Sequence, residues 1–199
     1  MKKTRRTPEN LSDRFALSLV KFLRFFADSF FKKRYGHRAV VLETVAAVPG
    51  MVGGALIHFK SLRRIQDDKG WIEKLLAEAH NERMHLMTFV NIAQPNKFER
   101  LLIVFVQIIF VIFYGLFYII SPKTAHRFVG YLEEEAVLSY TQYLEEIESG
   151  RLPNVPAPKI AIEYWDLSPN ATLRDVVLKT RKDEEHHRDA NHAFSDQLL

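Results

Sequence analysis

Apolar positions recur at helical spacing over most of this chain. Between residues 12 and 33, large apolar side chains follow one another every three or four positions, and basic side chains fall outside that stripe. The same periodicity predicts further helices over 38–64, 67–92, 98–120, 122–148 and 172–194. No stretch alternates apolar and polar residues as a half-buried strand does. The sequence therefore predicts an all-α fold.

Proline and glycine mark where these helices are expected to begin, break or end. The pair Pro49-Gly50 interrupts the second helix, Pro122 lies near the start of the fifth, and Gly150 follows its end. Either Asn170 or Thr172 is expected to cap the last helix, because both side chains accept backbone N–H groups at this kind of position.

Charge is distributed unevenly along the chain. Residues 1–38 hold eleven Lys or Arg and three acidic residues, whereas the remainder is mildly acidic. A basic, amphipathic N-terminal segment indicates binding to an anionic surface such as lipid or nucleic acid. A disordered basic tail explains the same charge pattern equally well. We expect residues 1–11 to form this tail and 12–199 to form one domain.

The chain contains no cysteine, which removes several classes of site. Disulfides, Cys-ligated zinc, iron–sulfur clusters and the c-type haem attachment are all excluded. Any metal must therefore be held by carboxylates and imidazoles. Neither haem nor flavin is expected as a cofactor.

Two Glu-x-x-His motifs are the strongest chemical signal. Glu82 and His85 form the first, and Glu184 and His187 form the second. Spacing of three residues places both side chains of a motif on one helix face. A single motif of this kind is weak, because Glu and His are common on solvated faces.

Each of two other helices carries a candidate inward carboxylate. Glu43 is the only charged residue between Arg38 and Lys60, and a lone charge in an apolar run requires a partner or a metal. In the run of three adjacent glutamates, Glu133 shares its face with apolar residues. Glu134 and Glu135 share theirs with polar residues, which favours exposure, so Glu133 is the expected ligand.

The order Glu, Glu-x-x-His, Glu, Glu-x-x-His on four successive helices is the ligand set of ferritin-like di-iron carboxylate proteins. Four carboxylates offset the charge of two divalent ions, and imidazoles leave coordination positions open for oxygen. The sequence thus predicts a four-helix bundle around two iron ions. The expected ligands are Glu43, Glu82, His85, Glu133, Glu184 and His187.

Four segments that contain these residues resemble the signature boxes of the alternative oxidase family of non-haem ubiquinol oxidases. They are LETVAAVPGMVGG, NERMHLMTF, YLEEEAVLSYT and DEEHHRDANH, and the resemblance extends over residues 37–195. It implies the same six iron ligands. It also implies oxidation of ubiquinol coupled to four-electron reduction of O2 to water, without proton pumping.

The resemblance assigns further residues to roles around the metals. Tyr140 is implied as a redox-active tyrosine near the iron. Residues implied to form hydrogen-bond networks behind the ligands are Asn81, Asp183, Tyr164 and Trp165. Residues implied to line the quinol pocket are Arg38, Leu42, Glu43, Ala136 and Ser139, the last in place of the threonine that is frequent in the family. His58 matches a position at the interface of a homodimer.

The run 101–120 has no charge and is a transmembrane candidate by hydropathy. However, Glu82 and His85 precede it and Glu133 follows it, so a single crossing would separate the ligands. We therefore expect helices 12–33 and 98–120 to lie in one leaflet, a monotopic arrangement that the resemblance also implies. Residues expected near anionic headgroups are Arg14, Lys21, Arg24, Lys32, Lys33 and Arg34.

Three other functions compete with the quinol oxidase. A di-iron hydroxylase uses similar motifs, an iron store shares the bundle, and a basic nucleic-acid module fits the positive beginning. The apolar fourth helix argues against storage, and no recognised motif supports nucleic acid. The bacterial cytoplasmic membrane, at its inner face, is the favoured location because no transit peptide is evident. The matrix face of the mitochondrial inner membrane is the alternative.

Overall fold

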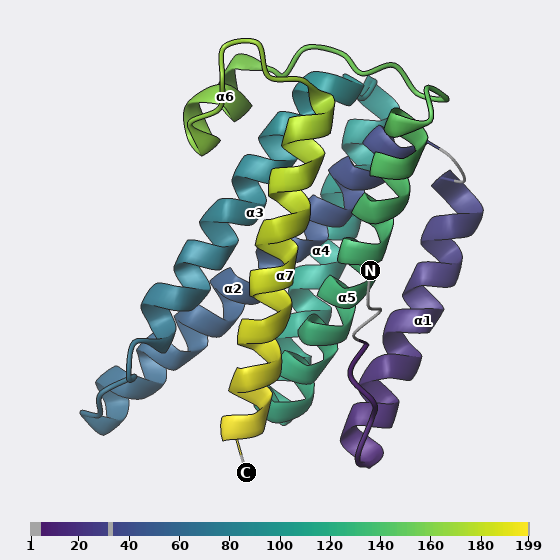
Figure 1. The fold of residues 1–199 in the computed structure, drawn as a ribbon. Coiled ribbons are helices and arrows are strands. Elements are labelled where there is room, and N and C mark those ends of the chain that lie inside the picture. The colour runs from purple at the N-terminus through teal and green to yellow at the C-terminus, as the bar shows by residue number, and fades with distance from the viewer. Residues whose placement is uncertain (1–4, 32–33, 199) are drawn as a thin grey trace. The chain divides into compact units, whose positions relative to one another are not determined.

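The computed structural model describes residues 5–31 and 34–198 (Figure 1). Over these residues the chain is helical apart from its connections and one isolated antiparallel bridge between Pro156 and Thr172. The all-α prediction is confirmed. The helices are α1 (Leu11–Phe31), α2 (Tyr35–Arg64), α3 (Trp71–Ala93), α4 (Lys97–Ile120), α5 (Pro122–Glu148), α6 (Lys159–Trp165) and α7 (Leu173–Gln197).

Two details of the predicted helices are wrong. The third helix begins at Trp71 rather than at 67, because Asp68 accepts the N–H of Ile72 at 2.8 Å and Gly70 takes a left-handed φ of 75°. The helix α2 runs without a break through Pro49, where an interruption was predicted. A proline inside a helix removes one backbone hydrogen bond, and here the helix continues across that loss.

Side-chain caps fix the beginnings of α4 and α7. Asn96 accepts the N–H of Glu99, and the Glu99 carboxylate accepts the N–H of Asn96, both at 2.9 Å. At α7 the N–H of Thr172 donates to the Asp175 carboxylate at 2.8 Å. Thr172 is therefore the cap, of the two candidates that the sequence offered.

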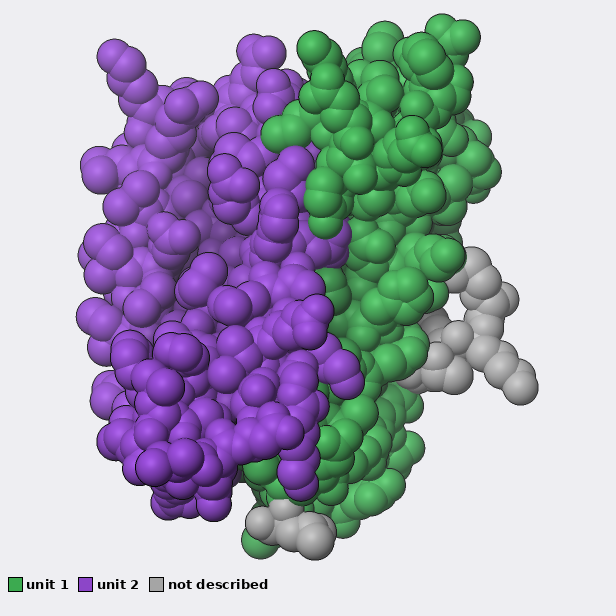
Figure 2. All heavy atoms as spheres, turned by 90° about the vertical axis from the view of Figure 1, so that its left-hand side faces the viewer, with its two compact units in different colours: residues 1–35, 122–199 green, residues 36–121 purple. Residues whose placement is uncertain are grey.

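The chain divides into two compact units, coloured separately in Figure 2. Unit 1 comprises residues 1–35 and 122–199, and unit 2 comprises residues 36–121. In unit 1, α5 and α7 pack along each other and α1 packs on α5 (Figure 1). The pair Glu148–Arg174 joins them at one end and Arg127–Asp196 at the other, so the two helices are antiparallel.

In unit 2, small residues of α2 allow a close helix crossing. A Cβ added at Gly50 would lie 2.3 Å from the carbonyl oxygen of Leu75 on α3. A Cβ at Gly53 would touch the ring of Tyr118 on α4 at 3.4 Å. The backbones of α2 and α3 can therefore approach at Gly50 only because it lacks a side chain.

Two helices expose apolar faces. On α4 the side chains of Tyr114 and Tyr118 are buried, whereas most other large apolar residues of this helix face outward. On α1 the exposed face includes Phe15, Phe22 and Phe26. Among the described residues, α2 and α4 are long and apolar enough to cross a membrane. Half of the apolar window of α2 is buried, as in a core helix, but only 17% of that of α4.

Gly50 gives a direct test of the α2–α3 crossing. We expect Gly50→Ala to lower the free energy of unfolding by roughly 1–3 kcal/mol, because backbone atoms must shift to admit the methyl group. The control is Gly115→Ala in α4, where the nearest atom to an added Cβ lies 4.0 Å away. That variant should be more stable by roughly 0.5–1 kcal/mol. Denaturant unfolding followed by circular dichroism measures both, and an unchanged Gly50→Ala stability would contradict the close crossing.

A buried histidine of unit 1 makes stability depend on pH. His126 on α5 is fully buried, and its Nδ1–H donates to the Asn191 amide oxygen at 3.0 Å. Burial lowers its pKa to about 4, against a smaller raising effect of the hydrogen bond to Asn191. Below about pH 6.5 the unfolded chain therefore takes up a proton that the folded chain takes up only near pH 4.

Stability should accordingly be lost as pH falls through this window, by up to about 3 kcal/mol from His126 alone. We expect His126→Gln, measured in metal-free protein, to flatten the unfolding free energy between about pH 6.5 and pH 4 relative to the parent chain. The exposed His186 provides the control, since His186→Gln should leave the slope unchanged. Parallel curves for the parent and His126→Gln would show that His126 is not buried in its neutral form.

Candidate metal centre

Unit 2 supplies one set of buried carboxylates with a histidine. Glu43 lies on α2, and Glu82 and His85 lie one turn apart on α3. All three are at most 2% exposed. His85 Nδ1 is 3.2 Å from a carboxylate oxygen of Glu43 and 3.4 Å from one of Glu82. One ligand atom from each residue lies within 4.8 Å of the others, a spacing that a metal ion can bridge.

Unit 1 supplies a second set of the same kind. Glu133 lies on α5, and Glu184 and His187 lie one turn apart on α7. Glu133 and Glu184 are 1% exposed and His187 is 8% exposed. His187 Nδ1 is 3.5 Å from a carboxylate oxygen of Glu184. Each set thus contains two buried carboxylates and one imidazole, and buried carboxylates require positive charge nearby.

Behind His187 lies a hydrogen-bond chain that the sequence analysis missed. Asn191 donates its side-chain N–H to the backbone carbonyl of His187 at 3.0 Å, and its amide oxygen accepts from His126. A signal for it was present, because Asn191 follows His187 by four residues and so lies on the same helix face. A fixed backbone at His187 restricts where its imidazole can point.

The other residues expected behind the ligands are partly connected. Trp165 donates its indole N–H to the Asp183 carboxylate at 2.8 Å, and its ring meets that of Tyr164 edge to face. Asp183 directly precedes Glu184 on α7, so this bond ties the short helix α6 to the ligand-bearing segment. Asn81 precedes Glu82 on α3 and is partly buried. Its role stays a prediction.

The residues predicted around the quinol lie on α2 of unit 2 and α5 of unit 1. In unit 2, Arg38 is 4% exposed and Leu42 is partly buried, both on the same helix as Glu43. In unit 1, Ser139 and Tyr140 are buried and Ala136 is partly buried on α5. Their assignment to a quinol pocket stays a prediction.

His58 is exposed on α2, with its ring against that of Phe59. Its place in a dimer interface also stays a prediction.

The expected exposure of Glu134 and Glu135 is wrong, since both are 8% exposed. Both carboxylates are paired within unit 1. Glu135 forms ion pairs with Arg5 and Arg24, and Glu134 accepts from the backbone N–H of Arg6 at 2.7 Å. The helix α5 is covered on several sides by α1, α7 and the N-terminal segment. A rule that assigns one polar face to the solvent therefore fails here.

This pairing adds a second role to the basic beginning of the chain, whose contact with lipid headgroups stays a prediction. Arg24 was expected at a lipid headgroup, but its side chain is 19% exposed and binds Glu135 and Asp28. Arg14, Lys21 and Arg34 are exposed, whereas Lys32 and Lys33 lie outside the described residues. The segment before α1 therefore neutralises buried acids of its own unit.

Comparison with known proteins agrees with the chemistry of the site. The family model described as alternative oxidase matches residues 1–196. A mitochondrial ubiquinol oxidase from Batrachochytrium dendrobatidis is 59% identical over 194 residues, which are 98% of this chain and 61% of that protein. The mitochondrial alternative oxidase 3 of Glycine max is 60% identical over 190 residues, 96% of this chain and 58% of that protein.

The mitochondrial ubiquinol oxidase 1c of Arabidopsis thaliana is 59% identical over 194 residues, 98% of this chain and 59% of that protein. The chain therefore spans about three fifths of the length of the curated relatives that it matches. All three are named mitochondrial, which supports the mitochondrial alternative and gives no support to the bacterial membrane favoured from the sequence. The chain belongs to the alternative oxidase family.

Proposed function

We propose that this chain is a ubiquinol oxidase that reduces O2 to water at a di-iron centre. The observation that carries the proposal is the pair of buried sets, Glu43, Glu82 and His85 in unit 2 and Glu133, Glu184 and His187 in unit 1. Family membership and relatives named ubiquinol oxidase support the substrate. We propose that the two sets together bind two iron ions.

The donor set fits iron. Four carboxylates and two imidazoles match the mixed oxygen and nitrogen ligation of di-iron carboxylate proteins, and four negative charges balance two divalent ions. The approach of His85 Nδ1 to Glu43 and Glu82 brings together groups that one cation can hold. The same ligands could bind zinc, but zinc has no redox chemistry. Oxidation of a quinol requires a redox-active metal.

The reaction consumes two quinols for each O2. Each quinol gives up two electrons and two protons and leaves as a quinone, and O2 takes four electrons and four protons to become two waters. Iron supplies the electron-accepting and oxygen-binding chemistry when bound. We propose that the protein's own contribution is to bind quinol, to hold the ligands and to handle protons without pumping them.

Several residues are proposed for these tasks. Arg38 on α2 is buried and positively charged, which suits a hydrogen bond to a quinol oxygen. Ser139 on α5 offers a hydroxyl as donor or acceptor. Leu42 and Ala136 supply apolar contacts for the ring. Tyr140 is 3% exposed and lies two turns from Glu133 on the same face of α5, where its phenol can supply one proton and one electron.

Loss of one ligand tests this assignment. We expect Glu133→Gln to lose most bound iron and to lower cyanide-insensitive, quinol-dependent oxygen uptake by roughly 100-fold or more. The control is Glu145→Gln, an exposed residue of the same helix, which should retain both. Iron per chain and oxygen uptake by purified protein are the measurements. Normal uptake in Glu133→Gln would refute the ligand set, and oxygen inserted into an organic product would identify a hydroxylase instead.

We also propose that the protein lies on one leaflet of the mitochondrial inner membrane, at the matrix face. The support is the outward apolar surface of α4, where Phe105, Ile112 and Leu116 are 58–60% exposed. Exposure of so large an apolar surface to water is unfavourable, whereas a helix that lies in the membrane interface buries this surface in lipid. The exposed aromatic face of α1, with Phe22 and Phe26, is proposed to lie in the same leaflet.

Liposome flotation tests the proposed lipid face. We expect Ile112→Glu to lower the fraction of protein bound to vesicles about tenfold, because a carboxylate in the acyl region costs at least about 2 kcal/mol. Val155→Glu introduces the same charge at an exposed apolar residue outside α1 and α4 and should bind as the parent chain does. Equal flotation of both variants would exclude α4 from the lipid interface.

A further inference from the structure

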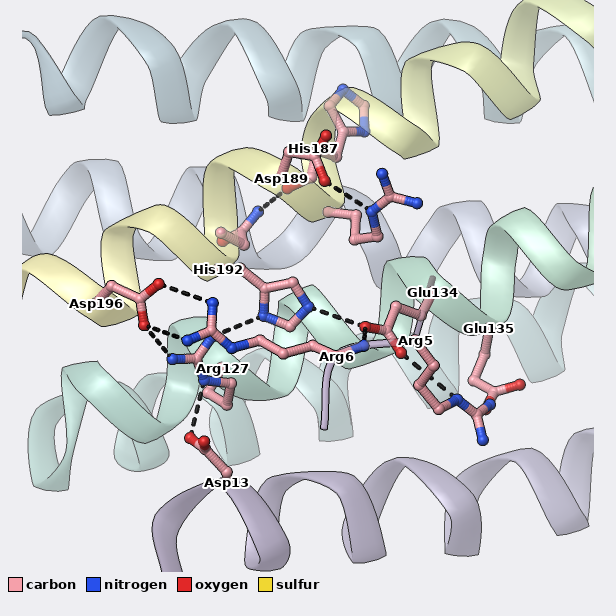
Figure 3. Close-up of polar contacts among 12 residues, drawn as sticks. Arg5, Arg6, Asp13, Arg127, Glu134, Glu135, His187, Asp189, His192 and Asp196 are labelled. Carbon is pink, nitrogen blue, oxygen red and sulfur yellow. Dashed lines mark hydrogen bonds and ion pairs between the residues drawn. The ribbon is translucent and has the colours of Figure 1, made fainter. Parts of the chain in front are cut away.

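Five residues of unit 1 form a closed ring of polar contacts (Figure 3). His192 and Glu134 approach at 3.2 Å, and Arg127 lies 2.9 Å from the other nitrogen of His192. Arg127 also binds Asp196, and the Arg6 guanidinium binds both oxygens of Asp196 at 2.8 and 2.9 Å. The backbone N–H of Arg6 returns to the Glu134 oxygen at 2.7 Å and closes the ring.

The contacts of the ring define the tautomer of His192. A guanidinium can only donate, so His192 Nδ1 accepts from Arg127 and its Nε2–H donates to Glu134. With a neutral imidazole, the two arginines and two carboxylates balance in charge. Asp13 on α1 adds a bond to Arg127 Nε at 2.9 Å, and Arg5 adds an ion pair to Glu134 at 3.5 Å.

The ring is buried where it joins the helices. Arg127 is 2% exposed, His192 7% and Glu134 8%. The side chains of Arg6 and Asp196 are 29% and 45% exposed, so their ion pair contributes little to stability. Breaking the contacts among the buried members is costly because each remaining group loses its partner. The geometry of these contacts is therefore strongly preferred over neighbouring arrangements of the same helices.

A glycine of α5 makes room for the ring. A Cβ added at Gly130 would lie 2.5 Å from His192 Nδ1, closer than any real contact. Glycine in the middle of a helix costs roughly 0.5–1 kcal/mol relative to alanine. The close approach of His192 to α5 explains why glycine occupies this position despite its low helix propensity.

The ring alternates between the two helices that carry the unit 1 ligands. Glu134 directly follows Glu133 on α5, and His192 and Asp196 follow His187 by five and nine residues on α7. At a rise of 1.5 Å per residue, His192 and Asp196 lie roughly 8 and 14 Å from His187 along the axis of α7. A slip of α7 along α5 would break the three ring contacts that join these helices directly, His192–Glu134, Arg127–His192 and Arg127–Asp196.

We propose that this ring sets the axial register of α5 and α7, and that Arg6 and His192 are positioning residues for Glu133, Glu184 and His187. Metal ligation tolerates errors of only about 0.5 Å, so the register must be fixed before the metal binds. The N-terminal segment thereby acts as a strap within its own unit. The effect on iron binding rests on the proposed di-iron function. The register of α5 and α7 does not depend on a bound metal.

Spin labels test the register in metal-free protein. The chain has no cysteine, so cysteines introduced at the exposed positions Glu145 on α5 and Lys182 on α7 are the only labelled sites. The parent should give a narrow distribution of label distances, and Arg6→Gln a broader or shifted one. The matched control is Arg174→Gln, which removes an ion pair to Glu148 at 2.8 Å between the same helices at their other end. It should leave the distribution unchanged.

Iron affinity supplies the second readout. We expect Arg6→Gln to weaken iron binding roughly tenfold, as losing a group that orients a ligand does, while Arg174→Gln binds as the parent. His192→Leu should show the larger loss and His192→Gln should recover part of it, because glutamine can still accept and donate. If His192→Leu fails to fold, the iron affinity of Arg6→Gln decides whether the ring positions the ligands.

The two readouts separate the possible failures. A parent chain that binds no iron refutes the proposed function, and the label distances then still decide the register. If Arg6→Gln matches Arg174→Gln in both label distances and iron affinity, the ring has only a general structural role and the inference is overturned.

Discussion

Buried negative charge is the constraint on which this structure depends. Three consecutive glutamates of α5, Glu133, Glu134 and Glu135, are each at most 8% exposed. Neighbouring residues of a helix point about 100° apart, so three such carboxylates cannot share one solvated face. Each needs a positive or hydrogen-bonding partner, because an isolated buried carboxylate would cost far more than a folded domain can offset.

The compensation comes from different parts of unit 1. Glu135 is paired with Arg5 and Arg24, from the N-terminal segment and α1, and Glu134 with Arg6 and His192. Glu133 is one of the proposed iron ligands. Three basic residues from the beginning of the chain, Arg5, Arg6 and Arg24, thus stabilise buried carboxylates of α5.

Helix content and the candidate ligands followed from the sequence because both depend on local spacing. Periodicity of 3.6 residues located the long helices, and Glu-x-x-His located two ligands on each of α3 and α7. The later start of α3 was not predicted, because it depends on a turn at Asp68 and Gly70. Asn191 was missed although its spacing from His187 was informative.

The partners of Glu134 and Glu135 could not have been predicted from spacing. Arg5 and Glu135 are 130 residues apart in the chain, and no local pattern relates them. Helix amphipathicity assumes one solvated face, whereas α5 is covered by α1, α7 and the segment before α1. The expected exposure of these glutamates failed for this reason.

Mössbauer spectroscopy of the protein loaded with ⁵⁷Fe tests the central claim most directly, because it counts the irons and shows whether they are coupled. The proposed site, in which four carboxylates and two imidazoles together bind two ions, predicts two irons per chain in a spin-coupled pair. Two uncoupled irons, one for each unit, or a single iron per chain would contradict the account.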